Sequence, residues 1–387
     1  MRCTSARKPR PWLLIFVPLV LAAGSASNAD DERYRTEYRS FTEALAAGDR
    51  DAATSHAHAA WQAAETELGD HRTTAILAFN YGRLVVFRHA DNPLVPLRRA
   101  ASLQASGTGD LSVTELQIYI DYAEFAAGGF KKRQGKKLRK SLEAFDDERI
   151  ASTPDAASIW LRLAASDVAA GQYRNALNSA TRAEAAIASA APLQLRERAE
   201  AILIAGIARL VPFPRAIDDV QAARKDFDRA RRLFLPQADI DSFDPLLAQI
   251  LAWDGAAGAA QASLLGEERD AKQREADARQ SRTMPKTFAY QMDESIDCAT
   301  VKWIERQAPQ FPRSALRRGS IGAVFVGFRL GDDLTARDAR VLAEVPVAEF
   351  GDAALSAMAH WRAAELPSGG PACHENLVSR FTFAIAN

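Results

Sequence analysis

Residues 160–183 read WLRLAASDVAAGQYRNALNSATRA, and this stretch indicates how the larger part of the chain folds. Its apolar and small residues recur at three- and four-residue spacing on both sides of Gly171, which predicts two helices. Small side chains at Ala164, Ala176 and Ala180 let two antiparallel helices approach closely, and Gly171 permits the turn between them. The stretch therefore predicts a helical hairpin.

The same spacing resembles a tetratricopeptide repeat. The residues that carry the resemblance are Trp160, Leu163, Ala164, Gly171, Tyr173, Ala176, Ala180 and Ala183. A weaker copy consists of Phe41, Gly48, Ala53, Ala57 and Ala60. The distance between the copies is not a multiple of the usual repeat of about 34 residues, so we expect divergent hairpins between them. The resemblance implies a tetratricopeptide-like helical solenoid.

Helical periodicity continues from Tyr34 to about Leu265, with no convincing alternating run. Short breaks separate the helix-length stretches, at 48–49, 68–70, 91–93, 107–110, 128–129, 152–154, 171, 191–192 and 212–214. Each of them contains Gly, Pro or Asp, residues that often end helices and form turns. We therefore expect an all-α domain of helical hairpins at residues 30–265.

Residues 1–29 have the pattern of a secretory signal peptide. Four basic residues precede the apolar run Trp12–Gly24, and small residues follow it. We expect cleavage after Ala29 or Ala26. The apolar run is shorter than the roughly 18–20 residues that span a bilayer. We predict export to the periplasm, with an uncleaved inner-membrane anchor facing the periplasm as the alternative.

Cysteine usage agrees with an exported protein. The chain has three cysteines, and Cys3 would leave with the signal peptide. Cys298 and Cys373 remain, and a pair in an oxidising compartment is more often a disulfide than a metal site or a nucleophile. We predict a Cys298–Cys373 disulfide.

Near the C-terminus the residue pattern changes. A charged segment, residues 266–292, is expected to be a linker between domains. Residues 322–330 alternate with a two-residue period and end at a Gly-Asp-Asp turn, which predicts a strand. A second strand at 336–342, a helix at 347–361 and a last strand at 378–385 follow. The order predicts a small α+β domain at residues 293–387.

This order resembles the C-terminal domain of TonB-type proteins. The motifs are Pro309-Gln310-Phe311-Pro312, then Ala315 and Gly319, then Gly322-Val324-Val326-Phe328, then Phe350 to Leu355, Trp361 and Pro367. In that family the domain lies in the periplasm and pairs edge-on with an extended segment of a partner, which for TonB is an outer-membrane transporter. The resemblance covers roughly Ala308 to Ile385 and implies that the last strand is the receiving edge. The residues of that edge are Val378, Arg380, Phe381, Thr382, Phe383 and Ile385.

The chain also departs from energy-transducing TonB proteins. Those proteins keep an N-terminal membrane helix with a His that contacts the proton-driven motor, and they carry a long Pro-rich spacer. Here Trp12–Gly24 contains no His, and a helical region stands in place of the spacer. We therefore predict a periplasmic protein-binding adaptor, with a groove of the helical region for one partner and the TonB-like domain for another. The alternative is a membrane-anchored energy transducer that acts on outer-membrane transport.

No residue pattern points to catalysis, a cofactor or a metal. His56 and His58 lie two positions apart on a predicted helix, so they point about 200° apart and cannot share a metal. A formal net charge of zero argues against a general nucleic-acid binder. The basic run from Lys131 to Lys140 predicts a solvated helix face, with an anionic lipid head group or an acidic partner as the alternative. For the last strand, the alternative to a partner protein is a homodimer, in which a second copy of the chain pairs with the same edge.

Overall fold

The computed structural model describes nine stretches of the chain. These are residues 32–87, 92–144, 153–212, 214–237, 244–265, 287–289, 301–366, 372–375 and 377–383. The predicted signal peptide, Cys298, Pro367 and Ile385 lie outside them, and so does most of the charged segment 266–292. None of the described helices is long and apolar enough to span a membrane.

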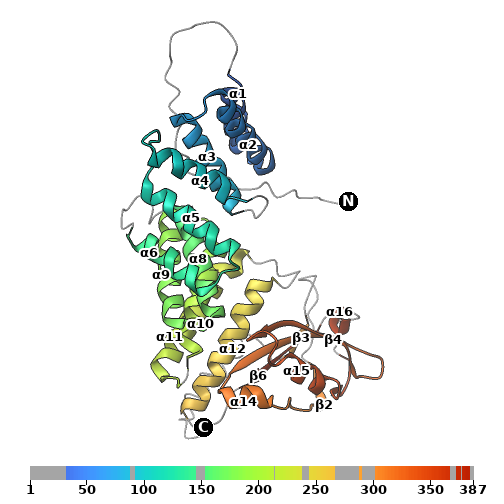
Figure 1. Ribbon diagram of the computed structural model, residues 1–387. Coiled ribbons are helices and arrows are strands. Elements are labelled where there is room, and N and C mark those ends of the chain that lie inside the picture. Colours follow the sequence, from blue (N-terminus) through green and yellow to red (C-terminus); the bar gives the residue numbers. More distant parts are fainter. Residues whose placement is uncertain are drawn as a thin grey trace. The chain divides into compact units, whose positions relative to one another are not determined.

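The described chain is mostly helical and ends in a small region of strands (Figure 1). This agrees with a helical solenoid followed by a small α+β domain. Contacts between residues divide the chain into two compact units. The first unit is Met1–Ser166 with Ala185–Ala191, and the second is Asp167–Glu184 with Pro192–Asn387.

Consecutive helices of the first unit pack in pairs. The helices are α1 (Arg33–Ala47), α2 (Arg50–Glu67), α3 (Arg72–Val86), α4 (Leu94–Ala105), α5 (Val113–Ala127) and α6 (Lys132–Ala144). Helix α1 packs on α2, α3 on α4 and α5 on α6, and α3 also contacts α5. The next two helices along the chain are α8 (Pro154–Ala169) and α9 (Tyr173–Ala190), separated by Gly171.

Many of the helices end at predicted breaks, for identifiable reasons, but the helix ends at Ala144 and Phe234 were not predicted. Gly48 after α1 has φ +75°, a left-handed conformation that glycine adopts without a steric penalty. Asp49 then caps α2, because its carboxylate accepts a hydrogen bond from the Ala52 N–H at 3.0 Å. Ser112 caps α5 in the same way through the Glu115 N–H. Gly171 between α8 and α9 has φ +68°.

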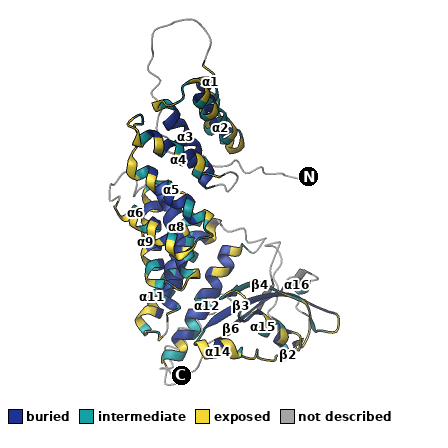
Figure 2. Ribbon diagram, in the orientation of Figure 1, coloured by how far each residue is buried: buried dark blue, intermediate teal, exposed yellow. Residues whose placement is uncertain are grey.

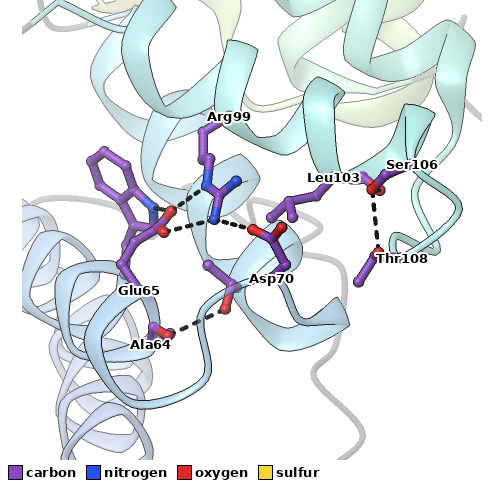
Figure 3. Close-up of polar contacts among 9 residues, drawn as sticks. Ala64, Glu65, Asp70, Arg99, Leu103, Ser106 and Thr108 are labelled. Carbon is purple, nitrogen blue, oxygen red and sulfur yellow. Dashed lines mark hydrogen bonds and ion pairs between the residues drawn. The ribbon is translucent and has the colours of Figure 1, made fainter.

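One arginine fixes α4 to the end of α2 (Figure 3). Arg99 of α4 donates to both carboxylate oxygens of Glu65, from Nε at 2.8 Å and from Nη2 at 2.9 Å. The same Nη2 donates to Asp70, in the turn after α2, at 2.7 Å. Hydrogen bonds to these carboxylates raise the pKa of the Arg99 guanidinium. The fork geometry of arginine lets one side chain hold two segments in register.

A buried ion pair joins three helices of the first unit. Asp155, in the first turn of α8, accepts a hydrogen bond from Arg83 Nε of α3 at 2.7 Å. The hydroxyl of Tyr119 on α5 donates to the same carboxylate oxygen at 2.6 Å. Burial raises the pKa of Tyr119, which keeps its hydroxyl protonated as a donor. The side chains of Arg83 and Asp155 are only 5% and 6% exposed, so water does not replace either partner.

Three helices of the second unit share one apolar core. They are α10 (Leu195–Leu210), α11 (Ile217–Phe234) and α12 (Pro245–Leu265), and Figure 2 shows α12 as largely buried. Helices α10 and α11 approach closely at Gly206, where an added Cβ would lie 2.5 Å from the Phe227 ring. A larger residue at position 206 would therefore clash with a buried ring.

Two sheets form the C-terminal part of the second unit. The larger one has the order β1-β6-β3-β4, with β1 (Thr287–Ala289), β3 (Gly322–Leu330), β4 (Ala336–Val345) and β6 (Leu377–Phe383). All neighbours in it are antiparallel. The smaller sheet pairs β2 (Trp303–Glu305) with β5 (Arg362–Ala363). The C-terminal part also contains three short helices, α14 (Arg313–Arg318), α15 (Gly351–Met358) and α16 (Ala372–Glu375).

The strands β3 and β4, the helix α15 and the strand β6 follow one another along the chain as predicted, but β5 and α16 lie between α15 and β6 and were not predicted, and β4 extends to Val345. The helix expected at 347–361 is α15, which spans only Gly351–Met358. Its start is fixed by Glu344, whose carboxylate accepts the N–H groups of Glu349, Phe350 and Gly351. The helix ends at Met358, and the N–H groups of His360 and Trp361 donate to carbonyls three residues back before β5 begins at Arg362.

Both faces of the larger sheet are covered (Figure 1). On one face Val324, Val326 and Phe381 join the core around α15. On the other face Phe325 and Val378 join the core of α10, α11 and α12. Helix α12 contacts β3, β4 and β6, and this packing was not predicted from the sequence.

Candidate protein-binding edge of the C-terminal sheet

Strand β6, near the C-terminus, contains most of the predicted edge residues. All seven of its residues pair with β3, from Gly322↔Phe383 to Phe328↔Leu377, with no shift of register. Gly322 permits this pairing beside α15, because an added Cβ there would lie 2.3 Å from the Phe350 ring and 2.4 Å from the Val345 carbonyl. The pairing of β6 with β3 is therefore regular along the whole strand.

The outer side of β6 is not open along its whole length. Strand β1 pairs with the first three residues of β6, in the register Thr287↔Ser379, Phe288↔Val378 and Ala289↔Leu377. Val378 is thus covered by a segment of its own chain. No strand in the described part of the chain pairs with the outer side of residues 380–383. The described part of the predicted edge that no strand covers therefore consists of Arg380, Phe381, Thr382 and Phe383. Ile385 lies outside the described residues.

The side chains of these four residues alternate between the two covered faces. Phe383 stacks on Phe350 with ring centroids 4.5 Å apart, and Phe381 lies against Trp361 at 5.0 Å. Arg380 and Thr382 point to α12, where a Cβ added at Gly255 would lie 3.3 Å from Arg380 Cδ and 3.5 Å from Thr382 Cγ2. Packing on both faces holds the strand, so the outer side presents backbone groups in fixed positions.

Charges lie behind this edge, between β6 and α12. Burial lowers the pKa of the Arg380 guanidinium and raises the pKa of the Asp254 carboxyl on α12. Arg224 of α11 lies 3.8 Å from Asp254 and donates to Gln261 of α12 at 2.6 Å. These groups attract one another across the contact and position β6 on α12.

The opposite edge of the sheet, β4, differs from β6 in regularity. The pairing of β4 with β3 shifts register twice, between Phe325 and Val326 and between Gly327 and Arg329. Asp338 has φ +52°, and Arg337, Asp338 and Arg340 are exposed. Bulges and charges of this kind block pairing with another strand. Of the two edges, β6 is the one with regular geometry.

A disulfide lies directly before β6. Cys373 of α16 is disulfide-bonded and has no exposed surface. The other two cysteines of the chain, Cys3 and Cys298, lie outside the described residues, so the pairing with Cys298 stays a prediction.

Peptide mapping of the non-reduced protein is expected to yield a Cys298–Cys373 linked peptide. The bond closes a loop of roughly 75 residues, for which chain entropy gives about 4 kcal/mol of stabilisation. Cys298→Ser is therefore expected to lower the melting temperature. Two free thiols, or a link from Cys373 to Cys3, would contradict the predicted pairing.

Among the residues that the structure describes, histidines and acidic residues do not form a metal-binding cluster. In the described chain, no group of three or more His, Cys, Asp or Glu residues could hold a metal ion. His56 binds Glu37 at 2.8 Å, whereas His58 stacks on Tyr81 with ring centroids 4.7 Å apart. The two histidines thus have different neighbours, as their spacing predicts.

Comparison with known proteins adds no assignment. No protein-family model matches the chain, and no functionally curated protein matches it significantly. The resemblance to TonB-type domains rests on the residues quoted above.

Proposed function

We propose that the chain is a periplasmic adaptor whose TonB-like C-terminal domain binds an extended segment of a partner protein at β6. The incoming segment adds a strand beside residues 380–383 and continues the line that β1 begins at residues 377–379. Main-chain hydrogen bonds supply most of the affinity in this mode of binding. The supporting observation is the contrast between the regular edge of β6 and the irregular, charged edge of β4.

The tetratricopeptide-like helical region supplies a second binding surface in this proposal. The paired helices of the first unit and the buried alanines of α2, among them Ala53, Ala57 and Ala60, support it. Repeat regions of stacked helix pairs offer extended surfaces for protein partners. The adaptor then joins one partner at the helices to another at the sheet.

Site-specific crosslinking in intact cells tests the proposed edge. A photo-crosslinking residue at exposed Thr382 is expected to capture a partner protein, because the added strand would lie beside it. The same residue at exposed Arg340, on β4, is the matched control and is expected to capture none. Capture from position 340 but not from 382 would contradict the assignment. An adduct of twice the chain's mass would make a second copy the partner.

A further inference from the structure

Helix α6 presents a strongly basic face to solvent. Its inner side is apolar, since Leu138 and Leu142 are buried and Gly135 lies against Phe125. Its outer side carries the exposed cations Lys132, Arg133, Lys136 and Lys140, and exposed Lys131 lies directly before the helix. We call these five residues the basic surface. Three of them, Lys132, Lys136 and Lys140, recur every four residues and so form a row about 12 Å long.

The charges of the basic surface are not neutralised by neighbouring acids. Lys137 is the cation that pairs with α5, through Asp121 at 2.9 Å and Glu124 at 3.0 Å. Glu124 also pairs with Arg98 at 3.3 Å. Within the described residues, none of the five cations of the basic surface forms an ion pair. Asp121 and Glu124 are thus committed to Lys137 and Arg98, while Glu143 of α6 is exposed and forms no ion pair with the five cations.

The residue types of the basic surface favour an anionic lipid surface over a protein as its partner. Protein interfaces depend on buried aromatic, Met and Arg anchors, and lysine is depleted in them. Residues 131–144 expose no large apolar side chain, and four of the five cations are lysines. An anionic lipid surface needs no such anchor, because it attracts clustered Lys and Arg through its surface potential.

We propose that the basic surface binds the anionic face of a lipid bilayer. The contact is electrostatic and peripheral, since the exposed part of α6 has no apolar side chain to insert. It is independent of the strand edge at β6. Attachment through α6 would leave a protein partner to be bound elsewhere on the chain.

Co-sedimentation with vesicles tests this proposal. The chain from Asp30 onward keeps every described residue and omits the apolar run Trp12–Gly24. It is mixed with vesicles of phosphatidylglycerol and phosphatidylcholine, or of phosphatidylcholine alone. The variant combines Lys132→Gln, Lys136→Gln and Lys140→Gln. The matched control removes three exposed cations elsewhere, by Lys225→Gln, Arg313→Gln and Arg317→Gln.

We expect the unsubstituted chain to bind the anionic vesicles and not the neutral ones. Each lysine near an anionic surface contributes about fivefold to binding, so the triple α6 variant is expected to bind roughly a hundredfold more weakly. The control variant is expected to bind within a few-fold of the unsubstituted chain. Binding should also weaken steeply between low and physiological salt.

Several results would overturn the proposal. One is equal loss of binding in the α6 variant and the control, because only total charge would then matter. Another is equal binding to neutral and anionic vesicles. Tighter binding to polyglutamate or to duplex DNA than to anionic vesicles would show that the partner is a polymer and not a bilayer. Circular dichroism of both variants excludes unfolding as the cause of a loss.

Discussion

Replacing Asp155 with alanine is expected to lower the free energy of unfolding by about 3–5 kcal/mol, the range for breaking a buried ion pair. Arg83 would lose a carboxylate oxygen that lies 2.7 Å from its Nε and 2.6 Å from its Nη2. Tyr119 would lose its acceptor at 2.6 Å. The guanidinium is almost fully buried, so water cannot compensate for the missing charge.

Urea unfolding followed by circular dichroism measures this effect, and hydrogen exchange assigns the loss to α3 and α5. Asp110→Ala is the matched control, because Asp110 pairs with Arg72 in the same unit with both side chains at least 60% exposed. That change is expected to cost less than about 1 kcal/mol. Equal effects of the two substitutions would mean that the Arg83–Asp155 pair does not stabilise the first unit.

A double substitution separates the cost of an unpaired charge from the value of the pair. Arg83→Met combined with Asp155→Leu removes both charges and replaces them with apolar groups. The double variant is expected to be more stable than Asp155→Ala alone, since no buried guanidinium is left without its carboxylate. A double variant that is less stable would show that the ion pair itself stabilises the fold.

Local sequence signals predicted most of the elements because each break has a local cause. Gly48 and Gly171 adopt left-handed conformations, and Asp49 caps a helix with its own side chain. The strand Gly322–Leu330 was predicted with its observed ends, because its two-residue alternation is bounded by glycine. Such signals need no information from distant parts of the chain.

Contacts between distant segments could not be predicted in the same way. Arg83 and Asp155 are 72 residues apart, and nothing near either residue indicates its partner. Strand β1 has only three residues, too few for a recognisable alternation. Its pairing with β6 covers Val378, one of the six predicted edge residues.

One signal for the packing of α12 was present in the sequence. Residues 245–265 read PLLAQILAWDGAAGAAQASLL, which is apolar on nearly every side of a helix. A helix of this kind must be buried on more than one side. In the structure it packs on α11 with one side and on β3, β4 and β6 with another. This composition indicates burial on several sides, but it does not identify the sheet as the neighbour.

The largest effect on partner binding is expected from Thr382→Pro. Adding a strand to an edge requires main-chain N–H donors, and proline has none. Thr382→Ala keeps the N–H and is expected to leave binding nearly intact. Thr382 is exposed and lies opposite Ala323 of β3. Opposite residues of an antiparallel pair alternate between hydrogen-bonded and non-hydrogen-bonded pairs, so the N–H of Thr382 points either to β3 or to the open side of β6.

The direction of that N–H decides how the proline result is interpreted. Neighbouring residues of an antiparallel strand direct their backbone groups to opposite sides, so Phe381 and Thr382 serve opposite sides of β6. An ester in place of the amide at each residue in turn removes one donor and keeps the side chain. If β6 is the binding edge, one ester abolishes partner capture at unchanged melting temperature, and the other lowers the melting temperature. If neither ester nor the proline affects capture while the protein stays folded, the partner does not bind beside residues 380–383.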